Sequence, residues 1–165
     1  MNAFVIDAFD FSRLKERAEG EIPVAELGRL AQETVDRSGT IKWTLSGDIG
    51  KLGHPQLSLA VSGAVNLICQ RCLTALPFEI ASESLLVLAK DDAEADAIEQ
   101  QLDNDEIDVV VGSSAFDARA LIEDETLLAL PVAAKHETCP DAGVAVEAKG
   151  AQRVSPFAAL KQLKQ

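Results

Sequence analysis

Alternation of apolar and polar residues is the feature that most limits how this chain can fold. Ile41, Trp43 and Leu45 alternate with polar residues, and the apolar residues of 57–69 also recur at period two. Because successive side chains of a β-strand point to opposite faces of a sheet, this period predicts two half-buried strands, and residues 78–88 look like another strand.

Short links between these stretches favour antiparallel pairing. Residues 50–55 have the composition of a turn, and a further apolar run at 107–111 predicts another short strand. Gly63, inside the second stretch, indicates a β-bulge. We therefore expect an α+β fold, in which an antiparallel β meander or a partly closed barrel packs with a few helices.

Helical patterns flank the strands. The first 40 residues predict a short strand, a helix capped by Ser12 that ends at Gly20, and a second helix after Pro23. Asp117 is suited to cap a later helix that Pro131 ends. The length of 165 residues fits one domain. Its expected parts are a strand and helices over 1–40, mainly β structure over 41–111 with an acidic insert at 91–108, a helix over 114–130 and a terminal helix over 155–164.

Charge limits the classes of partner. The net charge is −12, with 27 acidic against 15 basic residues, and nine of the 18 residues from Asp91 to Asp108 are Asp or Glu. Such a chain repels phosphate backbones, so a basic protein is the better matched partner. The acidic block predicts either a solvated loop or short exposed helix, or a docking surface for that partner.

The N-terminus predicts no secretion. Acids lie within the first ten residues, where a signal peptide would carry basic ones. No run approaches the roughly 18 apolar residues of a membrane span. Three cysteines, an odd number, do not favour a disulfide framework. We expect a soluble, cytoplasmic protein with no membrane partner.

Two short motifs have the spacing of metal ligands. Cys69 and Cys72 form C-x-x-C, and His136 and Cys139 form H-x-x-C. Together they would make a Cys3His set, which holds structural zinc in proteins. The alternative is three reduced thiols and a hydrogen-bonded histidine. A redox role is disfavoured, because redox C-x-x-C motifs begin a helix in a βαβ unit.

Three consecutive acids lie in the helix predicted over 114–130. Glu123, Asp124 and Glu125 cannot all share one exposed face, because successive helical residues are about 100° apart. Glu125 falls on the apolar stripe, and a buried carboxylate needs a partner. We expect that partner to be Arg71, beside the cysteines.

The order of these motifs resembles the YceD family. The likeness lies in V-S-G-A-V-N-L-I-C-Q-R-C-L, then I-E-D-E-T-L-L-A-L-P followed by a histidine and a cysteine, then the terminal S-P-F-A-A-L-K-Q-L-K. It extends from about residue 41 to the end. The matched positions are Cys69, Arg71, Cys72, Glu123, Asp124, Glu125, Pro131, His136, Cys139, Pro156 and Phe157.

The resemblance implies a ribosome biogenesis factor that is not an enzyme and affects synthesis, processing or stability of 23S ribosomal RNA. In many bacteria the family's gene lies beside that of a small, basic large-subunit ribosomal protein. We expect the chain to bind a basic ribosomal protein or assembly factor. Its contact with ribosomal RNA would be indirect, or weak through a basic patch of Arg71, Lys135, Lys149 and Arg153.

A metal-dependent hydrolase or nuclease is the alternative function. Clustered carboxylates can hold Mg²⁺, and the acidic helix and block would supply them. This alternative needs three acids that converge in one cleft.

Overall fold

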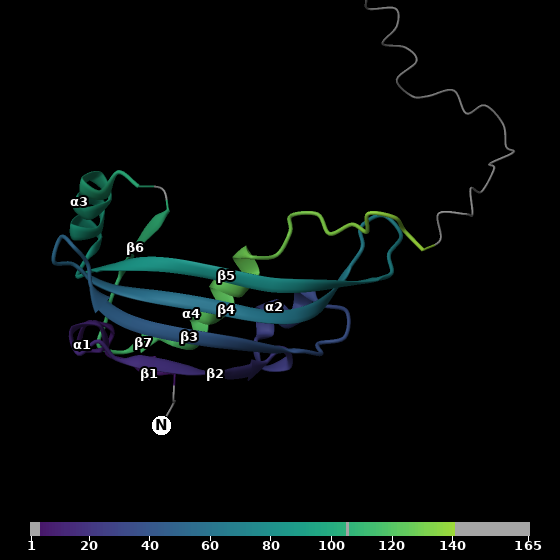
Figure 1. Ribbon diagram of the computed structural model, residues 1–165, viewed down its shortest axis with the longest axis horizontal. Coiled ribbons are helices and arrows are strands. Elements are labelled where there is room, and N and C mark those ends of the chain that lie inside the picture. The colour runs from purple at the N-terminus through teal and green to yellow at the C-terminus, as the bar shows by residue number, and fades with distance from the viewer. Residues whose placement is uncertain (1–3, 105, 141–165) are drawn as a thin grey trace, which may run out of the picture.

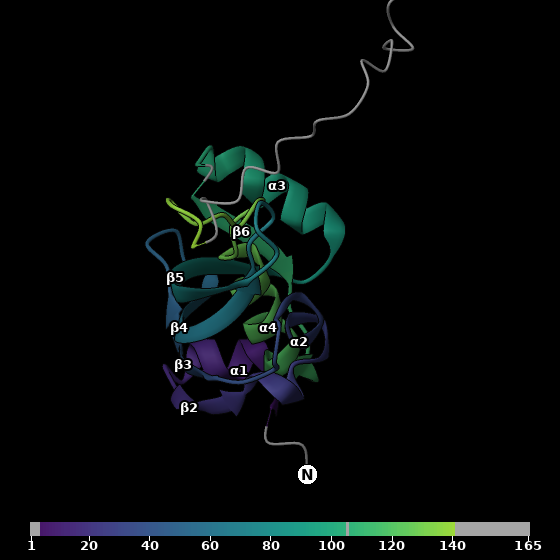
Figure 2. The same cartoon turned by 90° about the vertical axis from the view of Figure 1, so that its right-hand side faces the viewer.

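The computed structural model describes residues 4–104 and 106–140, which form an α+β fold of two layers. One layer is a five-stranded sheet, and most of the helices cover one of its faces (Figures 1 and 2). The helix Asp92–Leu102 packs against the opposite face, where Ile98 is buried with Val87 and Ala89. The strands follow one another across the sheet in chain order: β2 (Arg17–Pro23), β3 (Thr40–Ile49), β4 (Pro55–Ile68), β5 (Ala75–Ala89) and β6 (Ile107–Val111).

The period of two positions the core. On β4, the side chains of Leu57, Leu59 and Val61 are buried, whereas the alternating residues Ser58 and Ser62 are exposed. Leu59 lies opposite Leu45 of β3 and Ser84 of β5, so the buried face continues across three strands. The hydrophobic core therefore lies between this inner face and the helices.

Within the described residues, five helical segments and a small second sheet complete the fold. Helix α4 (Ala118–Leu128) crosses the inner face of the sheet, where Ile122 and Thr126 are fully buried (Figure 1). The other elements are β1 (Val5–Ile6), which pairs with β7 (Phe116–Asp117), and the helices α1 (Ala8–Arg13), η1 (Val24–Glu26), α2 (Gly28–Glu33) and α3 (Asp92–Leu102).

The α+β class is confirmed, with one change to the meander. Strands β2 to β5 pair antiparallel as expected, but β6 pairs parallel to β5. A parallel neighbour requires a crossover connection, and α3, within the acidic insert, is that crossover. The sheet is open, with β2 and β6 at its edges, so the barrel alternative does not apply.

The prediction for residues 12–20 was wrong. The helix begins earlier, because the side chain of Asp7 accepts hydrogen bonds from the backbone N–H groups of Phe9 and Asp10. Ser12 instead lies inside α1, where its hydroxyl donates to Ala8 O. The residues that follow form the edge strand β2.

The remaining helix predictions differ in extent. The helix after Pro23 is a 3-10 turn followed by the six-residue α2. Asp117 caps α4 as expected, accepting from the backbone N–H groups of Arg119 and Ala120. The terminal helix expected over 155–164 lies outside the described residues.

Gly63 makes no bulge. The ladder passes through it without interruption, pairing it with Ile41 on one side and Ile80 on the other. A Cβ at this position would lie 2.6 Å from the carbonyl oxygen of Thr40. Glycine is therefore required here by the close approach of β3.

Replacing Gly63→Ala should lower the free energy of unfolding by about 1–3 kcal/mol, because the added methyl overpacks the sheet. Gly28→Ala is the control, since a Cβ there would meet nothing within 4 Å. Urea denaturation measures both. Equal stabilities for the two variants would show that β3 does not approach Gly63 closely.

Candidate functional site

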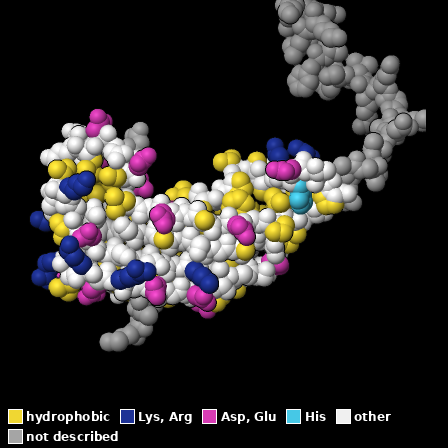
Figure 3. All heavy atoms as spheres, in the orientation of Figure 1, with side chains coloured by type: hydrophobic (Ala, Val, Ile, Leu, Met, Phe, Trp, Pro, Cys, Tyr) yellow, Lys and Arg dark blue, Asp and Glu magenta, His cyan; other side chains and the backbone are white. Residues whose placement is uncertain are grey.

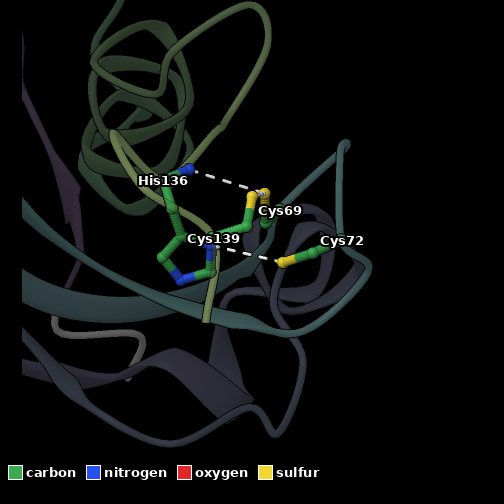
Figure 4. A group of neighbouring side chains, drawn as sticks. All are labelled: Cys69, Cys72, His136 and Cys139. Atoms are coloured by element: carbon green, nitrogen blue, oxygen red, sulfur yellow. Dashed lines mark hydrogen bonds between the residues drawn. The ribbon is translucent and has the colours of Figure 1, made fainter. Parts of the chain in front are cut away.

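The loop between β4 and β5 holds the first two candidate ligands in a tight turn. The backbone N–H of Cys69 donates to Thr74 O at 2.9 Å, and that of Leu73 donates to Cys69 O at 2.8 Å. Leu73 has φ of 61°, a left-handed conformation that leucine rarely adopts. The turn brings Cys69 and Cys72 to one side of the loop (Figure 4).

The segment after α4 brings the other two ligands. The backbone N–H of Gln70 donates to Ala134 O at 2.8 Å, which joins this segment to the cysteine loop. The backbone N–H of His136 donates to the sulfur of Cys69 at 3.4 Å. Cys139 is buried against the same sulfur (Figure 4).

The four ligand atoms of Cys69, Cys72, His136 and Cys139 all lie within 4.8 Å of one another. The sulfurs of Cys69 and Cys139 are 3.9 Å apart, and Cys72 Sγ is 3.4 Å from His136 Nδ1. Tetrahedral zinc with bonds of about 2.3 Å to sulfur and about 2.0 Å to nitrogen separates its ligands by roughly 3.5–3.8 Å. The arrangement is therefore compatible with a zinc site, which we name the Cys3His cluster.

The orientation of His136 also suits a metal. Its Nε2 lies 3.2 Å from the carbonyl oxygen of Ala75. A carbonyl only accepts hydrogen bonds, so this contact places the ring proton on Nε2 and leaves the lone pair on Nδ1, which faces Cys72. Metal-binding histidines commonly donate their second ring nitrogen to a carbonyl in this way.

The thiols differ in acidity. Burial opposes ionisation of Cys69, but hydrogen bonds from the backbone N–H groups of Cys72, His136 and Arg71 outweigh it and lower the pKa of its thiol to about 5. Burial and the neighbouring sulfurs raise the pKa of Cys139 to about 11. Cys69 is thus prepared as a thiolate, the form that binds metals.

The carboxylates of α4 pair with a cation that we did not predict. Arg29 contacts both Glu123, at 3.1 Å, and Asp124, at 2.6 Å. Glu123 Oε1 also accepts from the backbone N–H groups of Arg29, at 2.7 Å, and Leu30, at 3.2 Å. Glu123 therefore acts as the N-terminal cap of α2.

The expected Arg71–Glu125 pair is not formed. Glu125 is half-buried, and its Oε1 accepts a hydrogen bond of 2.5 Å from the hydroxyl of Ser82 on β5. Arg71 is exposed and makes no ion pair with any described residue. A hydroxyl on the sheet directly beneath α4 satisfies the carboxylate without a cation.

Sequence features could have indicated Arg29 but not Ser82. Leu27, at the N-cap position of α2, makes no side-chain hydrogen bond to the helix. A helix that begins without a polar cap needs an acceptor from elsewhere in the chain, and the buried acid of another helix is a suitable one. Ser82 lies in an ordinary alternating strand, so nothing in its local pattern predicts contact with Glu125.

Among the residues that the structure describes, carboxylates do not converge as the hydrolase alternative requires. Within residues 4–104 and 106–140, the Cys3His cluster is the group in which three or more metal-ligating side chains meet. The described acids of the 91–108 block are spread over α3, the connection after it and β6.

A family model described as "Large ribosomal RNA subunit accumulation protein YceD" matches residues 57–164. The chain belongs to the YceD family. The match confirms the resemblance and supports a role in ribosomal RNA accumulation. It includes the Cys3His cluster and the three acids of α4, whereas Arg29 lies outside it.

Other comparisons add no relative of this YceD-family chain: no curated protein and no solved structure matches it. Among the described residues, no helix is long and apolar enough to cross a membrane.

The capping contact predicts unequal roles for two neighbouring acids. Glu123→Ala should lower the free energy of unfolding by about 1–2 kcal/mol, because two backbone N–H groups of α2 lose their acceptor. Asp124→Ala should have a much smaller effect, since Asp124 is 53% exposed and bonds only the Arg29 side chain. Chemical denaturation of both variants measures the difference. Equal losses would contradict the capping role.

Proposed function

We propose that this YceD-family chain is a cytoplasmic ribosome biogenesis factor that acts by binding rather than catalysis. It affects synthesis, processing or stability of 23S ribosomal RNA through a basic ribosomal protein or assembly factor. The family match carries the proposal, and the charge of the chain supports a protein as the direct partner.

Helix α3 is the proposed docking surface. Asp92, Asp96 and Glu99 are exposed, and none of them forms an ion pair with a described residue. Asp103 and Asp108 continue the acidic surface around a hollow of about 350 Å³. Carboxylates without internal partners remain available to an external cation, so this surface attracts basic proteins.

The two ends of the molecule differ in character. Figure 1 shows α3 at the end of the sheet opposite the β4–β5 loop. At the other end, the backbone hydrogen bond between Gln70 and Ala134 joins the β4–β5 loop to the segment after α4. Arg71 directly follows Gln70, and Lys135 directly follows Ala134. We propose this end for weak contact with ribosomal RNA. Lys149 and Arg153, expected in the same basic patch, lie outside the described residues.

We further propose that the Cys3His cluster binds one structural zinc ion. The ligand spacing, the orientation of His136 and the hydrogen bonds to the Cys69 thiolate support this. Four protein ligands leave no open position for substrate, as in structural rather than catalytic zinc sites. The ion would join the β4–β5 loop to the segment that follows α4.

Neutralising α3 should weaken partner binding. Asp96→Asn with Glu99→Gln is expected to reduce recovery of a basic ribosomal protein or assembly factor several-fold in pull-downs at low salt, with about 0.5 kcal/mol lost per carboxylate. Recovery by the unaltered chain should fall at high salt, because salt screens exposed charges.

The matched control is Glu79→Gln with Glu83→Gln, which removes two exposed charges from the outer face of the sheet. It should bind as the unaltered chain does. Equal losses of partner recovery for the two double variants would show that binding depends only on the net charge of the chain. Tight binding of the purified chain to free 23S RNA would contradict the protein-mediated proposal.

Zinc content should depend on the cluster alone. Untagged protein is expected to contain about one zinc per chain, and both Cys69→Ser and His136→Ala should lose most of it and unfold at lower temperature. His54→Ala is the control, because the other histidine lies in the β3–β4 turn, away from the cluster. Mass spectrometry of the metal measures the content. Full zinc in the His136→Ala variant would exclude it as a ligand.

A further inference from the structure

An apolar groove lies beside the Cys3His cluster. It has a volume of about 420 Å³ and runs between the last turn of α4, the segment after it and the end of β4. Its lining includes Ile68, Leu127, Leu128, Leu130 and Val132. Figure 3 shows hydrophobic side chains gathered on the surface towards this end of the molecule.

The groove exposes large hydrophobic side chains to water. Leu128 is 80% exposed, Val132 102% and Ile68 50%. Covering such side chains is favourable by roughly 25 cal/mol for each Å² of apolar surface. Several large aliphatic side chains exposed along one groove favour a binding surface there.

The C-terminal segment of the same chain has the matching chemistry. In residues 155–164, Phe157, Leu160 and Leu163 recur at helical spacing and predict one apolar edge. Lys161 and Lys164 lie in the same segment. The groove presents the exposed carboxylate of Glu33, which no described residue pairs, so the charges are complementary.

The described chain ends next to the groove. Cys139 packs against Cys69, with 3.9 Å between their sulfurs, and Cys69 directly follows the groove residue Ile68. From Pro140, the residues up to Phe157 can span about 55–60 Å when extended. A tethered segment that can reach its site has an effective concentration near millimolar, which favours it over a free partner.

We propose that residues 155–164 bind in this groove and cover Ile68, Leu128 and Val132. This inference does not rest on the ribosomal function, and it would stand if α3 had no basic partner.

Methyl NMR of the full-length chain tests the contact. Leu160→Asp should shift the methyl resonances of Ile68, Leu128 and Val132, whereas Leu52, 63% exposed at the β3–β4 turn, should not move. Gln162→Asp is the matched control, because it adds the same charge to the polar side of the segment. It should leave the methyl resonances of the groove residues unchanged.

The reciprocal variant Val132→Asp should shift the backbone resonances of 157–163, and Leu52→Asp should not. Groove methyls that are the same in all variants would overturn the proposal and leave the groove to another protein. Shifts that disappear on dilution would also overturn it, because they would show that the segment binds a second copy.

Discussion

Packing of α4 across the sheet is the contact on which the rest of the structure depends. Ile122 and Thr126 are fully buried against the inner face, and burial of a side chain such as isoleucine contributes about 1.5–3 kcal/mol. On neighbouring positions of the helix, Glu123 caps α2 and Glu125 accepts from Ser82. One helix thus joins the N-terminal part of the chain to the sheet, and it determines where the segment carrying His136 and Cys139 begins.

That segment has little regular structure of its own. Residues 131–140 contain no helix or strand. The hydrogen bond from the backbone N–H of Gln70 to Ala134 O is one of the few backbone contacts that join them to the rest of the protein. A metal bound by ligands from both the β4–β5 loop and this segment would link the two strongly, because metal binding contributes directly to folding free energy. The Cys3His cluster would therefore stabilise the end of the molecule where the apolar groove forms, away from the acidic helix α3.

The sequence predicted the strands and the candidate ligands better than the tertiary partners. Alternating residues such as Leu57 and Leu59 report directly which face of a strand is buried, and the two ligand pairs have spacings that metal chemistry requires. Asp7 and Ser12 are both suitable caps, and only tertiary packing, which buries Ser12, decides between them. The uncapped start of α2 indicates that an acceptor must come from elsewhere in the chain, but Glu123 lies 94 residues from Arg29, so no local pattern specifies which acid supplies it.

Zinc-edge X-ray absorption of the untagged protein tests the central claim most directly, because it reports which atoms surround the metal. Structural zinc in the Cys3His cluster would have a first shell of three sulfurs at about 2.3 Å and one nitrogen at about 2.0 Å. A first shell of oxygen and nitrogen without sulfur, or protein that binds no zinc with its thiols reduced, would contradict it.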